Sequence, residues 1–295
     1  MPRSLETGTA TATGQPACAY TRAMNEPQSI KLSAAWRELK RERVAFSVLA
    51  YAGVALALCE YVILPVRFVE FFPGAMVEYA PGVLREGWDR VPAGSDAPWW
   101  GVLLPFMWWC GGLLVVWVLV PSLLTRLFGQ RVRDMGLGVR GLLPKLWVYG
   151  VMLAIVLVGV WWASTRPGFT RMYPMVKPWY WKNWSWVMLL AWWGIYALQF
   201  FAVEFFFRGW LLFTLEKRFG CAAIAIMVVP YCMIHFHKPL PEALGAIVAG
   251  TVLGWMALRT RSIWGGWLVH VSVAVTMDTA SLVKGDWGLP HQFWP

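Results

Sequence analysis

The amino-acid sequence predicts an all-α integral membrane protein, a bundle of about seven transmembrane helices. Hydrophobic residues make up 58% of the chain and charged residues only 14%, and the mean hydropathy is +0.52. Such a composition is typical of chains whose apolar surface is covered by lipid and by neighbouring helices. The 22 tryptophans support the same class, because tryptophan is enriched at membrane–water interfaces and packs well between helices.

Seven apolar runs are predicted as spans, because each is nearly or fully long enough to cross a bilayer as a helix. The fourth run would measure about 50 Å as one helix, so it must tilt, kink or extend into water. The predicted spans are residues 44–66, 99–124, 146–164, 186–218, 221–236, 243–258 and 262–283.

The chain divides into three parts by composition. Residues 1–30 are rich in Ala, Thr, Gly and Pro and lack the apolar segment of a signal peptide, which predicts a disordered tail. Residues 31–124 are predicted to form an amphipathic surface helix, over residues 32–43, and the first two spans. Residues 125–295 contain the remaining spans and the candidate site. No separate soluble domain is expected.

The basic residues lie mainly in short loops beside apolar runs, most densely in residues 125–145. This bias predicts an N-terminus inside and a C-terminus outside. The protein is expected in the cytoplasmic (inner) membrane of a prokaryote. The net charge of +10 could also suit nucleic acid. Because these charges adjoin apolar runs, they favour the lipid bilayer as the partner and argue against nucleic acid.

The chemistry is expected in the stretch QFFAVEFFFRGW, residues 199–210, where a glutamate and an arginine interrupt an apolar run. At helical spacing, Glu204 and Arg208 lie one turn apart on the same face, close enough to pair. Ionisable groups inside a membrane are costly and therefore indicate function. The alternative is a structural ion pair that locks two helices together.

Two histidines in other apolar runs, His235 and His270, are predicted to meet this pair. Counted along the helices from the inner side, Glu204 lies roughly 18 Å deep, His235 roughly 21 Å and His270 roughly 12 Å. All of these depths fall within a hydrocarbon core of ~30 Å. Three helices can therefore bring the four side chains to one cavity.

A carboxylate beside a neutral imidazole can take a proton from water, and a second imidazole can donate to a developing oxyanion. Two histidines and a glutamate also form a known zinc ligand set. However, no HExxH pair is present, so the spacing gives no support for zinc and no cofactor is expected.

The pattern VEFFFRG at residues 203–209, YCMIH at 231–235, and His270 followed by Ala274 resembles the CPBP intramembrane proteases, also called the CAAX-protease or Abi family. These proteins carry EExxxR, FxxxH and HxxxN on successive helices. The resemblance covers about residues 129–280 and makes residues 125–295 a protease-like core. It implies an intramembrane endopeptidase whose glutamate and histidine activate a water. The implied partner is a membrane protein or a lipid-anchored protein, cleaved near its C-terminus or its membrane anchor.

Carried over by position, Glu204 matches the second glutamate of the motif, and Arg208, His235 and His270 match its arginine and histidines. Two positions depart from the pattern: Val203 replaces the first glutamate, the family's general base, and Ala274 replaces the asparagine. Either Glu204 acts as the general base, or another carboxylate does so, or catalysis is lost. Glu242 is the candidate replacement, and its alternative role is a charge at the start of a helix.

Three functions follow from these observations. The first is an active intramembrane endopeptidase with Glu204, His235 and His270 as catalytic residues and Arg208 and Glu242 in support. The second is a catalytically inactive relative that binds a peptide or protein in the membrane, as a self-immunity or assembly factor. The third is a transporter or proton relay. Asp278, two turns beyond His270, is expected at the membrane interface.

Overall fold

The computed structural model describes residues 42–72, 99–178, 184–236, 238–285 and 288–295. Val44–Pro295 forms one compact unit, separate from Met1–Arg43. The predicted tail (1–30) and nearly all of the predicted surface helix (32–43) lie outside the described residues. The described part of the second unit consists of helices and connections with no named β-strand, which confirms the predicted all-α class.

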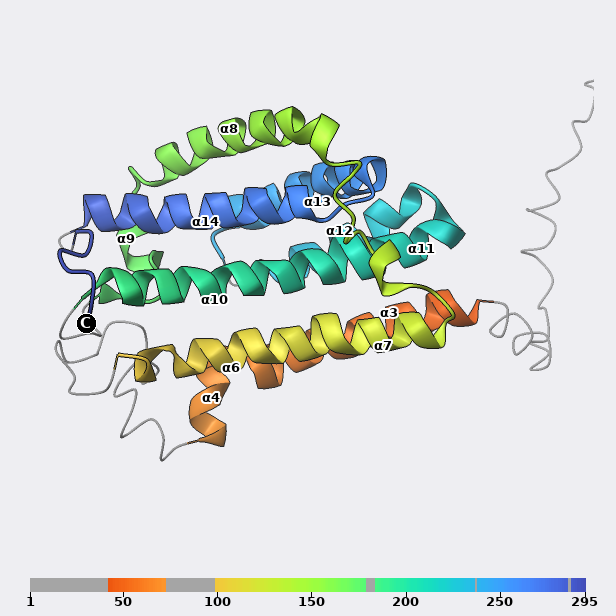
Figure 1. The fold of residues 1–295 in the computed structure, drawn as a ribbon, viewed down its shortest axis with the longest axis horizontal. Coiled ribbons are helices and arrows are strands. Elements are labelled where there is room, and N and C mark those ends of the chain that lie inside the picture. Colours follow the sequence, from red (N-terminus) through yellow and green to blue (C-terminus); the bar gives the residue numbers. More distant parts are fainter. Residues whose placement is uncertain (1–41, 73–98, 179–183, 237, 286–287) are drawn as a thin grey trace, which may run out of the picture. The chain divides into compact units, whose positions relative to one another are not determined.

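Within the described residues, six helical segments are long and apolar enough to cross a membrane, and they are drawn in Figure 1. Each segment contains one or two labelled helices, and several also include a short π-helical or 3-10 segment. They are Arg43–Ile63, which contains α3 (Arg43–Leu58); Gly101–Leu127, with α6 (Leu104–Leu113) and α7 (Val120–Leu127); Leu143–Ala163, with α8 (Leu146–Ala163); Trp186–Phe219, with α10 (Trp186–Glu204) and α11 (Leu212–Phe219); α13 (Leu240–Thr260); and α14 (Trp264–Lys284). Two short helices, α4 (Pro65–Phe71) and α9 (Phe169–Met172), lie in the connections.

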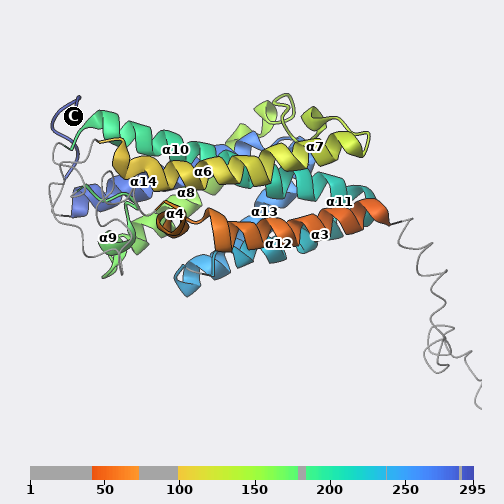
Figure 2. The same cartoon turned by 90° about the horizontal axis from the view of Figure 1, so that it is seen from below.

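The predicted fifth span is shorter than expected. Its helix, α12, covers Ala222–Met233, 12 residues, which corresponds to about 18 Å and cannot cross a hydrocarbon core of ~30 Å. The chain turns there because Pro239 and Pro241, at the start of α13, cannot continue a helix from the N-terminal side. As a result, the α12–α13 connection lies part way along α10 and α14 rather than at their ends (Figures 1 and 2).

The long fourth helix changes its winding where the candidate residues are. α10 begins directly after Ser185, whose side chain accepts a hydrogen bond from the backbone N–H of Met188, and it ends at Glu204. A π-helical segment, Phe205–Leu211, follows and is completely buried, before α11 resumes the α-helical path. Such π segments inside α-helices are frequent at functional sites.

Aromatic side chains of this π segment form much of the core that fixes the helix. Phe206 stacks on Trp117 with ring centroids 5.3 Å apart, and Phe207 packs edge-on against Tyr231 of α12 at 5.3 Å. α14 packs against both α8 and α10, while α12 packs against α13 (Figure 1). The candidate residues of α10, α12 and α14 are therefore held between well-packed helices.

Candidate active site

Glu204 and Arg208 form a buried ion pair, as their spacing predicts. Nη1 of Arg208 lies 2.9 Å from Oε1 of Glu204, and the two side chains are only 0% and 1% exposed. A charged pair so completely removed from water is costly to bury, and removing one partner leaves the other charge uncompensated. The residues around the pair must therefore keep the two charged groups in contact.

His270 of α14 completes the surroundings of the carboxylate. Its Nδ1 lies 2.9 Å from the same Oε1 atom of Glu204, and its ring stacks on Phe200 at 5.2 Å with the two planes parallel. Close approach of α14 depends on Gly266, because a Cβ atom there would lie 2.2 Å from Oε2 of Glu204. A glycine at this position thus makes room for the carboxylate.

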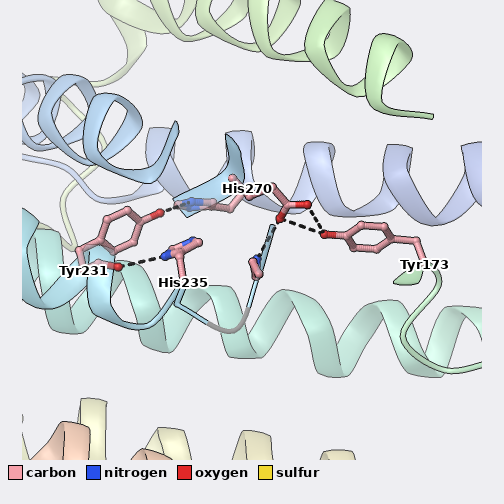
Figure 3. A network of polar contacts seen from close by, with 6 residues as sticks. Tyr173, Tyr231, His235 and His270 are labelled. Carbon is pink, nitrogen blue, oxygen red and sulfur yellow. Dashed lines mark hydrogen bonds and ion pairs between the residues drawn. The ribbon is translucent and has the colours of Figure 1, made fainter. Parts of the chain in front are cut away.

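Tyr231, near the end of α12, contacts both histidines (Figure 3). Its hydroxyl lies 3.0 Å from Nε2 of His270, and its backbone oxygen accepts a hydrogen bond from Nδ1 of His235 at 2.9 Å. The Arg208 guanidinium carbon lies 3.8 Å from the centroid of the Tyr231 ring, a distance typical of a cation–π contact. In the sequence, Tyr231 is only the first residue of the YCMIH motif, and the signal for its role is a hydroxyl four residues before His235, one helical turn away.

His235 lies in the turn after α12, half-buried, with its ring 4.9 Å from the Tyr231 ring. The structure thus brings Glu204, Arg208 and His270 into direct contact and connects His235 to them through Tyr231. We refer to these five residues as the polar cluster. The convergence predicted from depth along the helices is present, but the catalytic roles of its members stay predictions.

Glu242 is held outside the polar cluster, in the first turn of α13. Its carboxylate oxygens lie 3.2 and 3.3 Å from the Tyr173 hydroxyl, and Oε2 lies 3.8 Å from Nζ of Lys238. Burial and the nearby Glu242 carboxylate raise the pKa of Tyr173 above its ordinary value, so this phenol stays protonated and donates. Among the described residues, these are the polar side chains that contact Glu242.

Asp278 was expected at the interface, and the structure instead buries it completely within the protein. Its Oδ2 accepts hydrogen bonds from the indole N–H groups of Trp192, at 2.8 Å, and Trp193, at 3.3 Å. These partners on α10 explain how an acidic residue is accommodated between α10 and α14. Spacing from His270 alone could not reveal them, because both tryptophans are distant in sequence.

A metal site was not expected from the sequence. Within the described part of the chain, no group of three or more His, Cys, Asp or Glu side chains is placed to hold a metal ion. The two histidines of the polar cluster direct their Nδ1 atoms to a carboxylate and to a backbone oxygen. The absence of a cofactor stays a prediction.

Residues 183–276 match the family model described as Type II CAAX prenyl endopeptidase Rce1-like. No curated protein and no solved structure matches the chain significantly. The matched range contains every residue of the polar cluster and extends from the start of α10 into α14. It agrees with the resemblance of the motifs at residues 203–209, 231–235 and 270–274. Residues 183–276 are therefore similar to the CPBP, or CAAX-protease, family that the motifs resemble.

Proposed function

We propose that this protein is an intramembrane endopeptidase that hydrolyses a peptide bond in a membrane protein or a lipid-anchored protein. The observation that carries the proposal is the polar cluster itself. A buried Glu204, in contact with Arg208 and His270, is linked through Tyr231 to a half-buried His235 inside the family-matched segment. Polar groups of this kind among apolar helices indicate chemistry within the membrane.

The proposed reaction transfers the elements of water to the peptide bond. The water oxygen bonds to the carbonyl carbon while its proton passes to a base of the polar cluster. The carbon–nitrogen bond then breaks and the same proton goes to the leaving amine. Surrounding helices exclude bulk water, which strengthens the electrostatic interactions inside the site.

We place the protein in the cytoplasmic membrane of a prokaryote, with the N-terminus inside and the C-terminus outside. This orientation rests on the basic residues of the connection between α7 and α8, which the positive-inside rule assigns to the cytoplasm. The C-terminus lies outside if α12 and α13, whose connection lies part way along α10 and α14, enter and leave the membrane on the inner side (Figure 1). The substrate would enter laterally from the lipid bilayer. No nucleic-acid partner and no cofactor belong to the proposal.

The second candidate is a catalytically inactive relative that binds a protein in the membrane. Two side chains favour it: Val203 and Ala274 are apolar and buried, 4% and 5% exposed, where the family motifs have a glutamate and an asparagine. An inactive protein would keep the Glu204–Arg208 pair for stability alone. It would tolerate substitution of His235, whereas a peptidase would not.

The test compares the membrane proteins of cells that contain the native chain, His235→Ala or no gene, by mass spectrometry of new C-terminal ends. A peptidase produces fragment ends that need both the gene and His235. If the native chain and His235→Ala produce identical sets of ends, hydrolysis at this site is excluded. Capture of one membrane protein by both chains would then support the binding function.

A further inference from the structure

The contacts of the polar cluster indicate where a proton of His270 lies. Its Nδ1 lies 2.9 Å from Oε1 of Glu204, without the alignment of a hydrogen bond. Because an ionised carboxylate carries no proton, two lone pairs would face each other unless Nδ1 is protonated. In the tautomer with this proton, Nε2 accepts the Tyr231 O–H, 3.0 Å away.

Glu204 is also a poor candidate for the base that takes a proton from water. Its Oε1 is in contact with both Arg208 and His270, and its side chain is 1% exposed. To take a proton from water, it would have to give up its charge next to a guanidinium that is itself completely buried. The positive neighbour stabilises the ionised carboxylate and makes it a poor proton acceptor.

His235 differs from these groups in one respect. Its Nδ1 lies 2.9 Å from the backbone oxygen of Tyr231, and a carbonyl oxygen only accepts, so Nδ1 carries the proton and Nε2 has a free lone pair. Among the described residues, no hydrogen-bond partner of Nε2 is found. The ring is half-buried and lies in the α12–α13 turn, so it is not enclosed by the protein.

Tyr231 orients both histidine side chains of the polar cluster. Its hydroxyl holds His270 and its carbonyl holds His235, while its ring packs against the Arg208 guanidinium. The ring also requires Gly250 on α13, because a Cβ atom there would lie 2.9 Å from Cδ1 of Tyr231. One residue of α12 is therefore held by three other helical segments and in turn holds the two imidazoles.

We propose that His235, through Nε2, is the base that takes the proton from water, and that Tyr231 is the positioning residue that orients both imidazoles. This assignment rests on the proposed peptidase function and deepens it. Arg208 and His270 contact Tyr231 and hold it in place, and Glu204 contacts both of them. The site then works with a valine at position 203, since the base is an imidazole and no second carboxylate is needed.

The first experiment measures cleavage of a substrate identified from the cell comparison, by purified protein in lipid nanodiscs. His235→Ala is expected to slow turnover about 10²–10⁴-fold, the usual contribution of a general base, and added imidazole is expected to restore at least part of the rate. Glu204→Ala is not expected to recover with added acetate. Recovery of Glu204→Ala by acetate, without recovery of His235→Ala by imidazole, overturns the assignment.

The second experiment does not depend on cleavage. Protein labelled with ¹⁵N-histidine is studied by NMR, and the signals are assigned with His235→Ala and His270→Ala. Both residues are expected in the form protonated at Nδ1. Tyr231→Phe is expected to shift the Nε2 signal of His270, while the matched control Tyr51→Phe, which removes a hydroxyl bonded to Val116, leaves it unchanged.

The two experiments separate the inference from the proposed function. A parent protein that shows the expected NMR signals but cleaves nothing retains the positioning role of Tyr231 and loses the peptidase function. A parent that cleaves, with His235 protonated at Nε2 or with signals insensitive to Tyr231→Phe, retains the function and refutes the inference.

Discussion

Gly266 provides the sharpest test of the geometry around Glu204. A Cβ atom at this position would lie 2.2 Å from Oε2 and 2.8 Å from Cδ of Glu204. Because non-bonded heavy atoms are comfortable only at about 3.5 Å or more, the carboxylate of Gly266→Ala must withdraw by roughly 1 Å. Such a movement separates it from Arg208, from His270 or from both.

The expected loss of stability follows from two opposing effects. Overpacking costs about 1–3 kcal/mol, and a broken buried ion pair costs ~3–5 kcal/mol. Replacing a glycine inside a helix by alanine returns only about 0.5–1 kcal/mol. Because withdrawal of the carboxylate relieves the overpacking, the broken pair dominates, and the net loss is about 2–4 kcal/mol. This loss corresponds to a fall in Tm of roughly 3–6 °C for a chain of this size.

The assay is thermal unfolding of the purified protein in one detergent, followed by intrinsic tryptophan fluorescence. The matched control is Gly194→Ala on α10, where an added Cβ would meet nothing within 4 Å, and its Tm should be unchanged or slightly higher. Equal Tm values for Gly266→Ala and the native chain would show that the carboxylate is not confined by α14, and the described site would be wrong.

Three further predictions concern individual contacts. Arg208→Ala should reduce the yield of folded protein, because loss of one partner of a buried pair costs ~3–5 kcal/mol; normal yield and normal activity would exclude a structural role for the pair. Glu242→Gln should cleave substrate at nearly the native rate, because Glu242 contacts Tyr173 and Lys238 rather than the polar cluster; a rate as low as that of His235→Ala would instead make Glu242 the replacement acid. Asp278→Ala should lower the Tm, since Trp192 and Trp193 lose their buried acceptor, and an unchanged Tm would show that water replaces it.

Local sequence was enough to predict the class of fold and the identity of the central pair. Long apolar runs with few charges can bury themselves only in lipid, so composition alone indicated the helical spans. The spacing of Glu204 and Arg208 predicted their contact because a single helix fixes the distance between residues one turn apart. The ordered motifs at residues 203–209 and 231–235 predicted the family that the comparison then found.

The tertiary structure decided which groups lie across from one another. The end of α12 at Met233, the hydroxyl contact of Tyr231 with His270 and the partners of Asp278 each depend on helices that are far apart in the sequence. Sequence periodicity shows which face of a helix is apolar, but not which neighbour covers it or at what height. The need for glycine at position 266 is of the same kind, because it exists only when α14 lies against the Glu204 carboxylate.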